Sequence, residues 1–329
     1  MTQKNLYSPY AAEHAAPNGA GDSRPTAIQI VKDEGMIGVL EGKCAFITGC
    51  SSGIGIETAR ALHVAGANVF MQVRNVQKGE EVIKDIQEHS SSKGKIELIK
   101  MELGSFESIR KGSPNQFREL RRTILILDLG VMATPETKTE DGFELQLATN
   151  HLAHFLLFQL LKPTLWKSAT PSFNSRVVCL SSNGHHSGRL HFDNLNLENT
   201  YDPWAAYGQS KLANILMANY IDRVYGPKGI HAASVHPGLI KTGLDKFMDP
   251  TLLEAMKTKE QGAATTLWAA TGKVWEGKGG KYLENCAVAE PAANASAAAQ
   301  LGYAPHAYDE KAENKLWEVS CKLVGVRDD

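Results

Sequence analysis

From residue 41 onward, short apolar runs alternate with longer stretches whose apolar residues recur at helical spacing. The apolar runs are rich in Val, Ile and Leu, which is typical of strands that are covered on both faces. The longer stretches lie between them, as expected of repeated strand–helix–strand units. The pattern predicts strands at 43–48, 68–73, 95–101, 123–128, 176–181 and 230–235, a further strand around Tyr282, and helices at 56–65, 76–90, 105–122, 141–166 and 205–225.

These units predict a doubly wound Rossmann-type α/β fold, with a parallel sheet of about seven strands and helices on both faces, in a single domain over 41–329. The first 40 residues differ in composition. Residues 1–25 are rich in Ala, Asn, Gly, Ser and Pro and show little periodicity, whereas 28–31 are mostly apolar. We therefore expect an N-terminal extension over 1–40 that is partly disordered.

The composition limits the classes of partner. Of 329 residues, 43% are hydrophobic and 22% charged, as in soluble globular proteins, and the net charge of −1 offers no attraction for nucleic acid. No apolar run approaches the roughly 20 residues of a membrane span, so we expect a cytoplasmic protein without a transmembrane segment. The cysteines form no C-x-x-C pair and the histidines repeat no ligand spacing, which predicts free thiols and no metal site.

A glycine-rich turn, TGCSSGIG, follows the first predicted strand and leads into the first predicted helix. Glycines permit a tight turn and a close approach of a pyrophosphate, and the helix N-terminus offers free N–H groups and a positive dipole end. A plain glycine-rich loop is the alternative, but the position between strand and helix favours a dinucleotide site. The expected contacts are Gly49, Ser51, Ser52, Gly53, Ile54 and Gly55.

The end of the second predicted strand bears on the choice of cofactor. An acidic residue there binds the ribose 2′-OH of NAD, whereas an arginine suits the 2′-phosphate of NADP. The sequence has Val73-Arg74 and no carboxylate, and a guanidinium can bind a phosphate through two hydrogen bonds. We expect NADP(H) rather than NAD(H), the alternative for Arg74 being a solvated surface side chain.

Tyr207 and Lys211 form a Y-x-x-x-K spacing near the start of the helix predicted at 205–225. This spacing puts both side chains on one helix face. A free tyrosine, with a pKa near ~10, is a poor base at neutral pH. A nearby ammonium and the positive nicotinamide of an oxidised cofactor would lower that pKa, so that Tyr207 could exchange a proton with an alcohol or a carbonyl. The spacing alone is common by chance.

The order of the motifs resembles that of the short-chain dehydrogenase/reductase family. Besides the turn and the Y-x-x-x-K pair, the chain has LSS at the end of the fifth predicted strand, NHLAHF at 150–155 and HPGLIKT at 236–242. The epimerases and dehydratases of the other branch use a different glycine spacing, and an epimerase or dehydratase that retains NAD is a minor alternative.

The resemblance implies roles for individual residues. Tyr207 would be the acid or base, Ser182 would position the substrate oxygen, Lys211 would hold the ribose hydroxyls, and the backbone of Asn150 would support a proton relay. The full set of expected cofactor contacts beyond the turn is Arg74, Glu102, Asp128, Gly130, Lys162, Tyr207, Lys211, Pro237, Gly238, Ile240 and Thr242.

A closer resemblance is to the branch of retinol dehydrogenases and WW-domain oxidoreductases, carried by RLHFDNL at 189–195 and SKLANIL at 210–216. GKYLE and LWEVS near the C-terminus are similar to fungal members, and no WW domain is present. This implies alcohol–carbonyl interconversion on an apolar substrate (aromatic, polyketide-like or retinoid-like), with a role in fungal secondary metabolism and a homodimer or homotetramer. Apolar residues between 239 and 260 suggest a substrate lid over about 239–275.

One motif departs from the family. Where the fourth strand should end in Asn-Asn-Ala-Gly, the chain has Leu127-Asp128-Leu129-Gly130. Leu127 cannot form the brace that an asparagine makes between strands, and Asp128 places a carboxylate near the cofactor phosphates. Glu102 stands where the family has an aspartate and could still accept from the adenine amino group. The second hypothesis is therefore a catalytically impaired dinucleotide-binding or regulatory protein.

Overall fold

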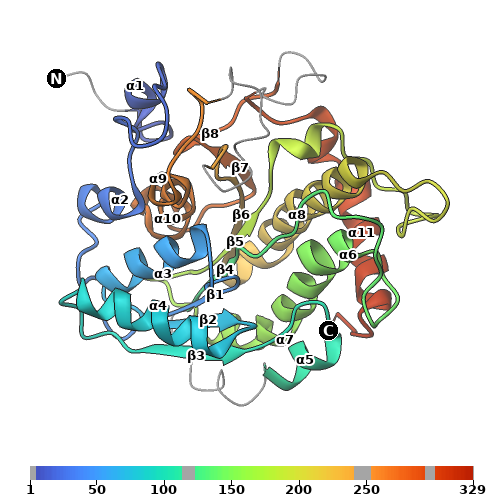
Figure 1. The fold of residues 1–329 in the computed structure, drawn as a ribbon, viewed down its shortest axis with the longest axis horizontal. Helices are drawn as coiled ribbons and strands as arrows, with labels where there is room; N and C mark the ends of the chain where they lie inside the picture. The colour runs from blue at the N-terminus through green and yellow to red at the C-terminus, as the bar shows by residue number, and fades with distance from the viewer. Residues whose placement is uncertain (1–4, 113–122, 241–252, 293–300, 329) are drawn as a thin grey trace.

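The computed structural model describes residues 5–112, 123–240, 253–292 and 301–328. In this part of the chain the strands form one sheet in the order β3-β2-β1-β4-β5-β6-β7-β8 (Figure 1). Every neighbouring pair from β3 to β7 is parallel, and β8 pairs with β7 in the antiparallel sense. The strands are β1 Cys44–Ile47, β2 Asn68–Val73, β3 Ile96–Lys100, β4 Thr123–Leu127, β5 Ser175–Leu180, β6 Ile230–His236, β7 Lys281–Glu284 and β8 Ala287–Val288. The predicted doubly wound fold is confirmed, with β8 as an additional edge strand.

The sheet is covered on both faces, since every residue of the central strands β1, β4 and β5 is buried. Along β1, Ala45 and Ile47 belong to one buried cluster while Cys44 and Phe46 belong to another, as the two-residue period of a strand requires. The first cluster includes residues of α2, α3, α4 and α10, and the second those of α5, α7, α8 and α11. The helices are α1 Ala11–His14, α2 Ala27–Asp33, α3 Ile54–Val64, α4 Val76–Glu88, α5 Phe106–Gly112, α6 Leu145–Leu147, α7 Ala153–Ser168, α8 Pro203–Tyr225, α9 Lys259–Gly262, α10 Ala264–Thr271 and α11 Glu310–Leu323, and the 3-10 turns are η2 Asn183–His186, η3 Gly226–Lys228, η6 Lys273–Trp275 and η7 Pro305–Tyr308.

The N-terminal extension packs on the domain over the part that is described, residues 5–40. Helix α2 begins at the N-cap Thr26, whose side chain accepts from the backbone N–H of Gln29. The helix buries Ala27, Ile30 and Val31 in the same cluster as α3 and α10. Helix α2 packs against α9 and α10 (Figure 1).

The predicted lid over 239–275 is corrected for its second half. All eight residues of α10 are buried, and the helix contributes Leu267 and Trp268, both fully buried, to the cluster beneath the sheet. Helix α10 is thus a layer of the core and not a cover over a pocket. The first half of the predicted lid includes 241–252, which lie outside the described residues.

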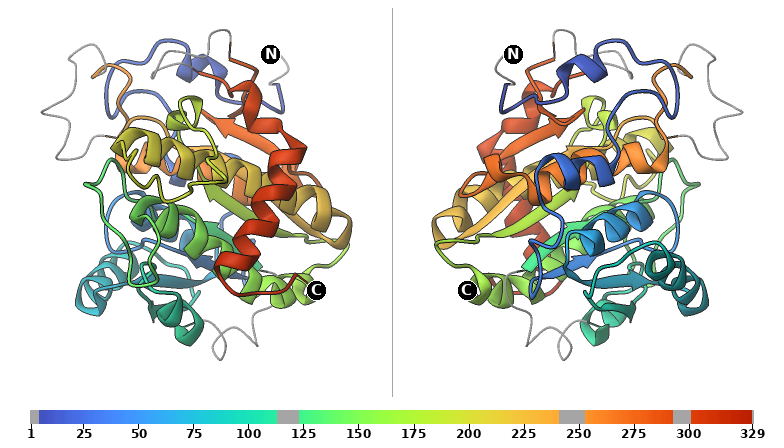
Figure 2. Two further views of the ribbon diagram at one scale, coloured as in Figure 1. Left: turned by 90° about the vertical axis from the view of Figure 1, so that its right-hand side faces the viewer. Right: turned by 90° about the vertical axis from the view of Figure 1, so that its left-hand side faces the viewer.

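The helix predicted over 141–166 is divided in three. Helix α6 is followed by a π-helical turn, η1 Ala148–Leu152, and then by α7. A π turn inserts one residue into the helical ladder and is frequent at functional sites. Helix α11 lies across α8 on the outer face (Figure 2). No helix in the described ranges is long and apolar enough to cross a membrane.

Candidate active site

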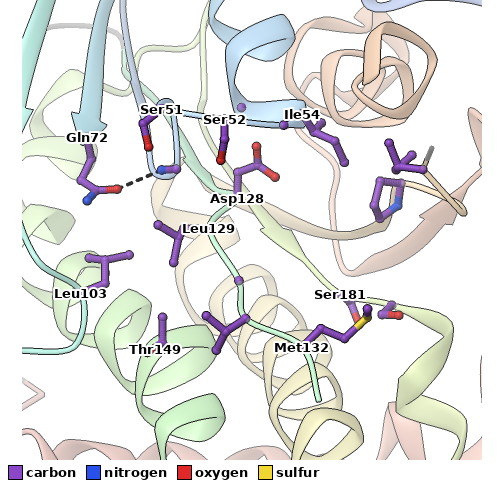
Figure 3. Close-up of a pocket in the computed structure, with 18 of the residues that line it drawn as sticks. Ser51, Ser52, Ile54, Gln72, Leu103, Asp128, Leu129, Met132, Thr149 and Ser181 are labelled. Carbon is purple, nitrogen blue, oxygen red and sulfur yellow. Dashed lines mark hydrogen bonds between the residues drawn. The ribbon is translucent and has the colours of Figure 1, made fainter. Parts of the chain in front are cut away.

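A pocket of about 680 Å³ lies at the carboxyl ends of the strands, where ligands bind in open parallel sheets. Its walls come from the segments that follow β1, β2, β3, β4, β5 and β6, together with Tyr207 of α8 (Figure 3). Fifteen of the residues singled out by the sequence line it: Gly49, Ser51, Ser52, Gly53, Ile54, Gly55, Arg74, Glu102, Asp128, Gly130, Ser182, Tyr207, Pro237, Gly238 and Ile240.

The glycine-rich turn has the shape that a pyrophosphate needs. Gly49 and Gly53 have φ of +81° and +70°, which favours glycine at both positions. A Cβ on Gly55 would lie 2.5 Å from the carbonyl oxygen of Gly49, so a side chain there would push the turn apart. Gly53 is the N-cap of α3 and offers no side-chain cap. The first N–H groups of α3 therefore stay available to an anion, and the residues fit a dinucleotide phosphate.

Gln72 supports this turn from near the carboxyl end of β2. Its Oε1 accepts from the backbone N–H of Gly49 at 2.9 Å, and its Nε2 donates to the carbonyl of Met101 at 2.6 Å (Figure 3). A fully buried amide that satisfies both its donor and its acceptor links the ends of β1, β2 and β3. Gln72 was not among the predicted site residues, although a single amide near the end of a mostly apolar strand is a usable signal.

The end of β4 is braced without an asparagine. The hydroxyl oxygen of Thr48 accepts from the backbone N–H groups of Asp128 and Leu129 at 2.8 and 3.0 Å. Its distance to Nε2 of His154 is 3.0 Å, and Nδ1 of His154 is 3.0 Å from the carbonyl oxygen of Asn150. Burial lowers the pKa of His154 to about 3, so its ring is neutral. Since Thr48 already accepts twice, it donates its proton to Nε2, and His154 donates from Nδ1 to Asn150.

Tyr207 and Lys211 lie one turn apart near the start of α8. Asp202 caps this helix by accepting from the N–H groups of Trp204 and Ala205 at 3.0 and 2.8 Å. The Nζ of Lys211 donates to the carbonyl of Leu180 at 3.2 Å and lies 5.7 Å from the centre of the Tyr207 ring. The predicted pair is therefore held at the end of β5.

The proton affinities of this pair differ from the expectation. Burial raises the pKa of Tyr207, and a hydrogen bond with Ser182 offsets this only partly. Burial also lowers the pKa of Lys211 to about 8, against the attraction of Asp128. The prediction that Lys211 lowers the pKa of Tyr207 does not hold for the protein alone, because desolvation dominates. Tyr207 is a neutral phenol at pH 7 and can act as a proton donor.

Ser182 is positioned by its neighbours. Its Oγ accepts from the N–H of Gly184 at 3.1 Å, and its carbonyl oxygen lies 2.6 Å from Nδ1 of His185. The other nitrogen of His185 accepts from the N–H of Ala304 at 3.1 Å. A Cβ on Gly184 would come within 2.9 Å of the Tyr207 ring, so this glycine permits the close approach of η2 to Tyr207.

Asn150 lies in the π turn behind the pocket. Its amide nitrogen donates to the carbonyl of Val131 at 2.9 Å and to Oγ of Ser210 at 2.9 Å, and its Oδ1 accepts from the N–H of Val131 at 2.8 Å. A Cβ on Gly130 would lie 3.1 Å from Nζ of Lys211 and 3.4 Å from Oδ1 of Asn150. Asn150 thus fixes the segment after β4 beside Lys211.

Three charged side chains occupy the cofactor end. Asp128 lies beside Ser52 and Ile54 (Figure 3), and burial raises its pKa to about 7 although Lys211 attracts its charge. Nε of Arg74 lies 3.7 Å from Oε2 of Glu102, and both side chains are exposed, at 81% and 46%. The carboxyl group of Asp128 thus lies beside the turn as predicted, and with a pKa of about 7 it is partly protonated at neutral pH.

Of the expected residues that the structure describes, Asn150, Lys162 and Lys211 do not line the pocket. Asn150 and Lys211 lie directly behind Gly130, whereas Lys162 lies elsewhere. Nζ of Lys162 lies 2.5 Å from Oδ1 of Asp328 and 3.4 Å from the hydroxyl of Tyr225. Its place among the cofactor contacts is corrected, because α7 carries it to a buried ion pair with the C-terminal tail. Thr242 lies outside the described residues. In the described ranges no group of three or more His, Cys, Asp or Glu side chains could hold a metal ion.

Comparison with known proteins agrees with the geometry. The sequence model of a family described as short chain dehydrogenase matches residues 43–252. Short-chain dehydrogenase/reductase prx1 of Penicillium roqueforti is 45% identical over 96% of this chain and 95% of its own length. Human retinol dehydrogenase 11 is 37% identical over 87% of each chain. A crystal structure of an uncharacterized protein from Mycobacterium paratuberculosis superposes with a TM-score of 0.66 at 30% identity, over 88% of this chain and 95% of that one.

Proposed function

The chain belongs to the short-chain dehydrogenase/reductase family, and from this premise we propose that it is an NADP(H)-dependent oxidoreductase that interconverts an alcohol with an aldehyde or ketone on an apolar substrate. The observation that carries the proposal is that Ser182 and Tyr207 line one end of the pocket with Lys211 behind Gly130 of its wall, while the glycine-rich turn and Arg74 form the other end. A dinucleotide laid along the edge of the sheet would reach from Arg74 to Tyr207.

The side chains at the catalytic end can perform the proton transfer. A bound nicotinamide cofactor would supply or accept the hydride. Tyr207, a phenol whose pKa is raised by burial, would donate its proton to a carbonyl oxygen, or take one from an alcohol. Ser182 already hydrogen-bonds Tyr207 and would orient the same oxygen. Lys211, with a pKa of about 8, keeps its proton at neutral pH and would donate to the ribose hydroxyls.

Asn150 would serve this site through its carbonyl oxygen as well as its side chain. That oxygen receives Nδ1–H of His154, and a carbonyl can accept a second hydrogen bond. The second lone pair would accept from a water on the way to Lys211, which lies against the same glycine as Asn150. The proton relay would therefore pass through the carbonyl of Asn150 as expected, and the hydrogen bond from His154 would hold that carbonyl in place.

The preference for NADP(H) over NAD(H) is supported by Arg74. Its ion pair with Glu102 spans 3.7 Å between two exposed side chains, and exposed pairs of this kind contribute little stability. A 2′-phosphate could therefore take the guanidinium without breaking a strong interaction. Glu102 also accepts from the N–H of Gly104 at 3.1 Å, which keeps the carboxylate occupied when Arg74 turns to the ligand.

The apolar substrate is supported by apolar residues in the lining of the pocket. Leu129, Val131, Met132, Leu239 and Ile240 line it, and the side chain of Met132 is 49% exposed. Cytoplasmic location and assembly as a homodimer or homotetramer stay as predictions. The support for a role in fungal secondary metabolism is the likeness to fungal relatives, among them oxidoreductase calI of Penicillium decumbens, which is 40% identical over 96% of this chain.

The second hypothesis, a catalytically impaired binding protein, was motivated by the altered end of β4. The backbone there is nevertheless held by Thr48, which satisfies the N–H groups of Asp128 and Leu129. The site behind the altered motif keeps its rigidity, which supports an enzyme.

Turnover with each cofactor tests the proposal. Purified protein is mixed with NADPH or NADH and a panel of aromatic and long-chain aldehydes and ketones, and the loss of cofactor absorbance is followed. We expect oxidation of NADPH for at least one apolar carbonyl, and loss of at least a hundredfold in rate for Tyr207→Phe, since general acid catalysis contributes on the order of 100- to 10,000-fold. Tight NADPH binding without turnover on the whole panel would favour the second hypothesis.

A further inference from the structure

One wall of the pocket, formed by residues 237–240, is held from behind by Lys257. The backbone N–H of Lys257 donates to the carbonyl of Leu239 at 2.7 Å, and Ile240 pairs with Lys257 in an isolated parallel bridge. Nζ of Lys257 donates to the carbonyl of Pro237 at 3.3 Å and to Oδ1 of Asn285 at 2.9 Å. Only 3% of Lys257 is exposed. This one residue therefore ties the wall to the β7–β8 hairpin.

The packing between Lys257 and the wall is tight. Gly238 has φ of +98°, and a Cβ there would lie 3.0 Å from Cδ, Cε and Nζ of Lys257. The stem of the lysine thus fills the space that a side chain would need. A shift of Lys257 would free both hydrogen bonds to the wall and leave a gap beneath it.

The segment that leads into Lys257, residues 254–256, is held by the N-terminal extension. Arg24, 5% exposed, donates from Nη1 to the carbonyl of Ala255 at 2.8 Å and from Nη2 to the carbonyl of Met256. The N–H of Gly19 donates to the carbonyl of Glu254 at 2.8 Å. The guanidinium is fixed in turn, because its Nε donates to Asp22 at 2.8 Å.

A second set of contacts joins the same two segments. Nε2 of Gln261 donates to the carbonyls of Asp22 and Arg24 at 3.1 and 3.0 Å, and its Oε1 accepts from the N–H of Gly21 at 2.9 Å. Hydrogen bonds therefore join residues 19–24 to residues 254–261 at several points, although the two segments are more than 200 residues apart in the chain.

We propose that residues 19–26 are part of the cofactor site, with Arg24 and Lys257 as positioning residues that hold the wall 237–240 against the nicotinamide half of the cofactor. The proposal rests on the proposed function, since it assumes that a dinucleotide lies along the pocket. The order of the strands supports the assignment to the nicotinamide half. The wall follows β6, next to β5 and Ser182, whereas Arg74 and Glu102 follow β2 and β3 at the other side of the sheet.

Arg176 provides a matched control. It is also a buried arginine, 7% exposed, and its Nη1 donates to two carbonyls, of Ala270 and Gly272, at 2.9 and 3.0 Å. Its Nη2 lies 3.0 Å from a carboxylate oxygen of Glu276, as the Nε of Arg24 pairs with Asp22. Arg176 lies at the start of β5, near the amino ends of the strands, whereas the pocket lies at their carboxyl ends. Its loss should cost stability without changing the wall.

The experiment compares two ligands on four proteins. Affinities for NADPH, which carries the nicotinamide, and for 2′,5′-ADP, which lacks it, are measured by titration on wild type, Arg24→Gln, Lys257→Met and Arg176→Gln. Melting temperatures show that each variant is folded at the temperature of the titration. We expect NADPH to bind about tenfold more weakly to Arg24→Gln and Lys257→Met, with 2′,5′-ADP unchanged within about twofold, since the loss is confined to one half of the ligand. Arg176→Gln should bind both ligands like wild type.

The outcomes separate the inference from the function on which it rests. A wild-type protein that binds neither NADPH nor NADH would overturn the proposed function and this inference with it. If wild type binds NADPH and a folded Arg24→Gln binds it equally well, the inference alone is overturned. Equal weakening of NADPH and 2′,5′-ADP, or the same effect in Arg176→Gln, would show a general loss of stability and also contradict it. Should Arg24→Gln not fold, Lys257→Met decides.

Discussion

Replacing Asp128 by asparagine restores the residue type that the family has at this position and removes one ionisable group from the phosphate end of the pocket. Burial raises the pKa of Asp128 to about 7, and its carboxylate lies beside Ser52 and the start of α3 (Figure 3). A carboxylate there repels a pyrophosphate, whereas the neutral acid does not. The affinity for the cofactor should therefore depend on the protonation of Asp128.

The size of the effect follows from the pKa. If the cofactor binds to the protonated form, its affinity falls by the factor 1 + 10^(pH − pKa). With a pKa of about 7, that factor is about 1.1 at pH 6 and about 11 at pH 8, a tenfold loss that corresponds to about 1.4 kcal/mol. Asp128→Asn should bind NADP⁺ with nearly the same affinity at both values, and about tenfold more tightly than wild type at pH 8.

The assay is a titration of wild type and Asp128→Asn with NADP⁺ at half-unit steps from pH 6 to pH 8.5. The 2′-phosphate of NADP⁺ also changes its charge over this pH range. Because this change affects wild type and Asp128→Asn alike, the ratio of their affinities isolates the effect of Asp128. The ratio of the variant's affinity to that of wild type should stay near one at pH 6, begin to rise near pH 7 and continue to rise to the end of the range. A ratio that stays constant over this range would refute the reasoning, since it would mean that Asp128 either keeps its proton or does not face the phosphates.

The same substitution changes stability in a defined direction. The pKa of Asp128 in the folded protein lies above the ordinary value of ~3.9 for an unfolded chain, so the folded state holds this proton more tightly. Stability is then lost as pH rises from about 4 to about 7, and the loss is complete above the folded pKa. Asp128→Asn should melt at a higher temperature than wild type at pH 8, with the difference shrinking toward pH 5.

Two further substitutions test the cofactor end. Thr48→Val leaves the N–H groups of Asp128 and Leu129 without their acceptor, and each orphaned buried group costs about 1–3 kcal/mol; thermal denaturation should show a lower melting temperature, with Thr48→Ser near wild type. Arg74→Ala should weaken NADPH binding by about tenfold, the value of one lost charged contact of about 1.4 kcal/mol, and leave NADH unchanged. Equal losses for both cofactors in direct titration would contradict the role given to Arg74.

Local patterns predicted the frame of the sheet well. The second strand was expected at 68–73 and is β2 Asn68–Val73, and Tyr282 lies on β7 as expected. Apolar runs of this length, bounded by turns, are determined by short-range chemistry. The π turn at Ala148–Leu152 was not predicted, because one extra residue in a continuously apolar helix leaves the spacing of the pattern almost unchanged.

The positions of Arg24 and Lys162 were not predicted because both side chains are held by long-range contacts. Residues 19–26 read as a polar, flexible tail, yet Arg24 is buried through bonds to residues more than 200 positions later. Lys162 was expected at the cofactor, yet it pairs with Asp328 near the end of the chain. In each case the partner lies in a distant segment, and neither composition nor periodicity identifies it. The proposed catalytic residues Ser182 and Tyr207 could be found because the motifs that contain them, LSS and Y-x-x-x-K, are short and local in the sequence.

The altered end of β4 links the two ends of the pocket through charge. Asp128 raises the pKa of Lys211 against the larger effect of burial, while Lys211 lowers that of Asp128. Removing the carboxylate therefore helps the phosphates to bind but lets the pKa of Lys211 fall below its present value of about 8. The asparagine variant should hold its cofactor better at pH 8 and lose the Lys211 proton at a lower pH than wild type. The carboxylate of Asp128 thus weakens cofactor binding at alkaline pH. It also raises the pKa of Lys211, which favours the charged form of the lysine.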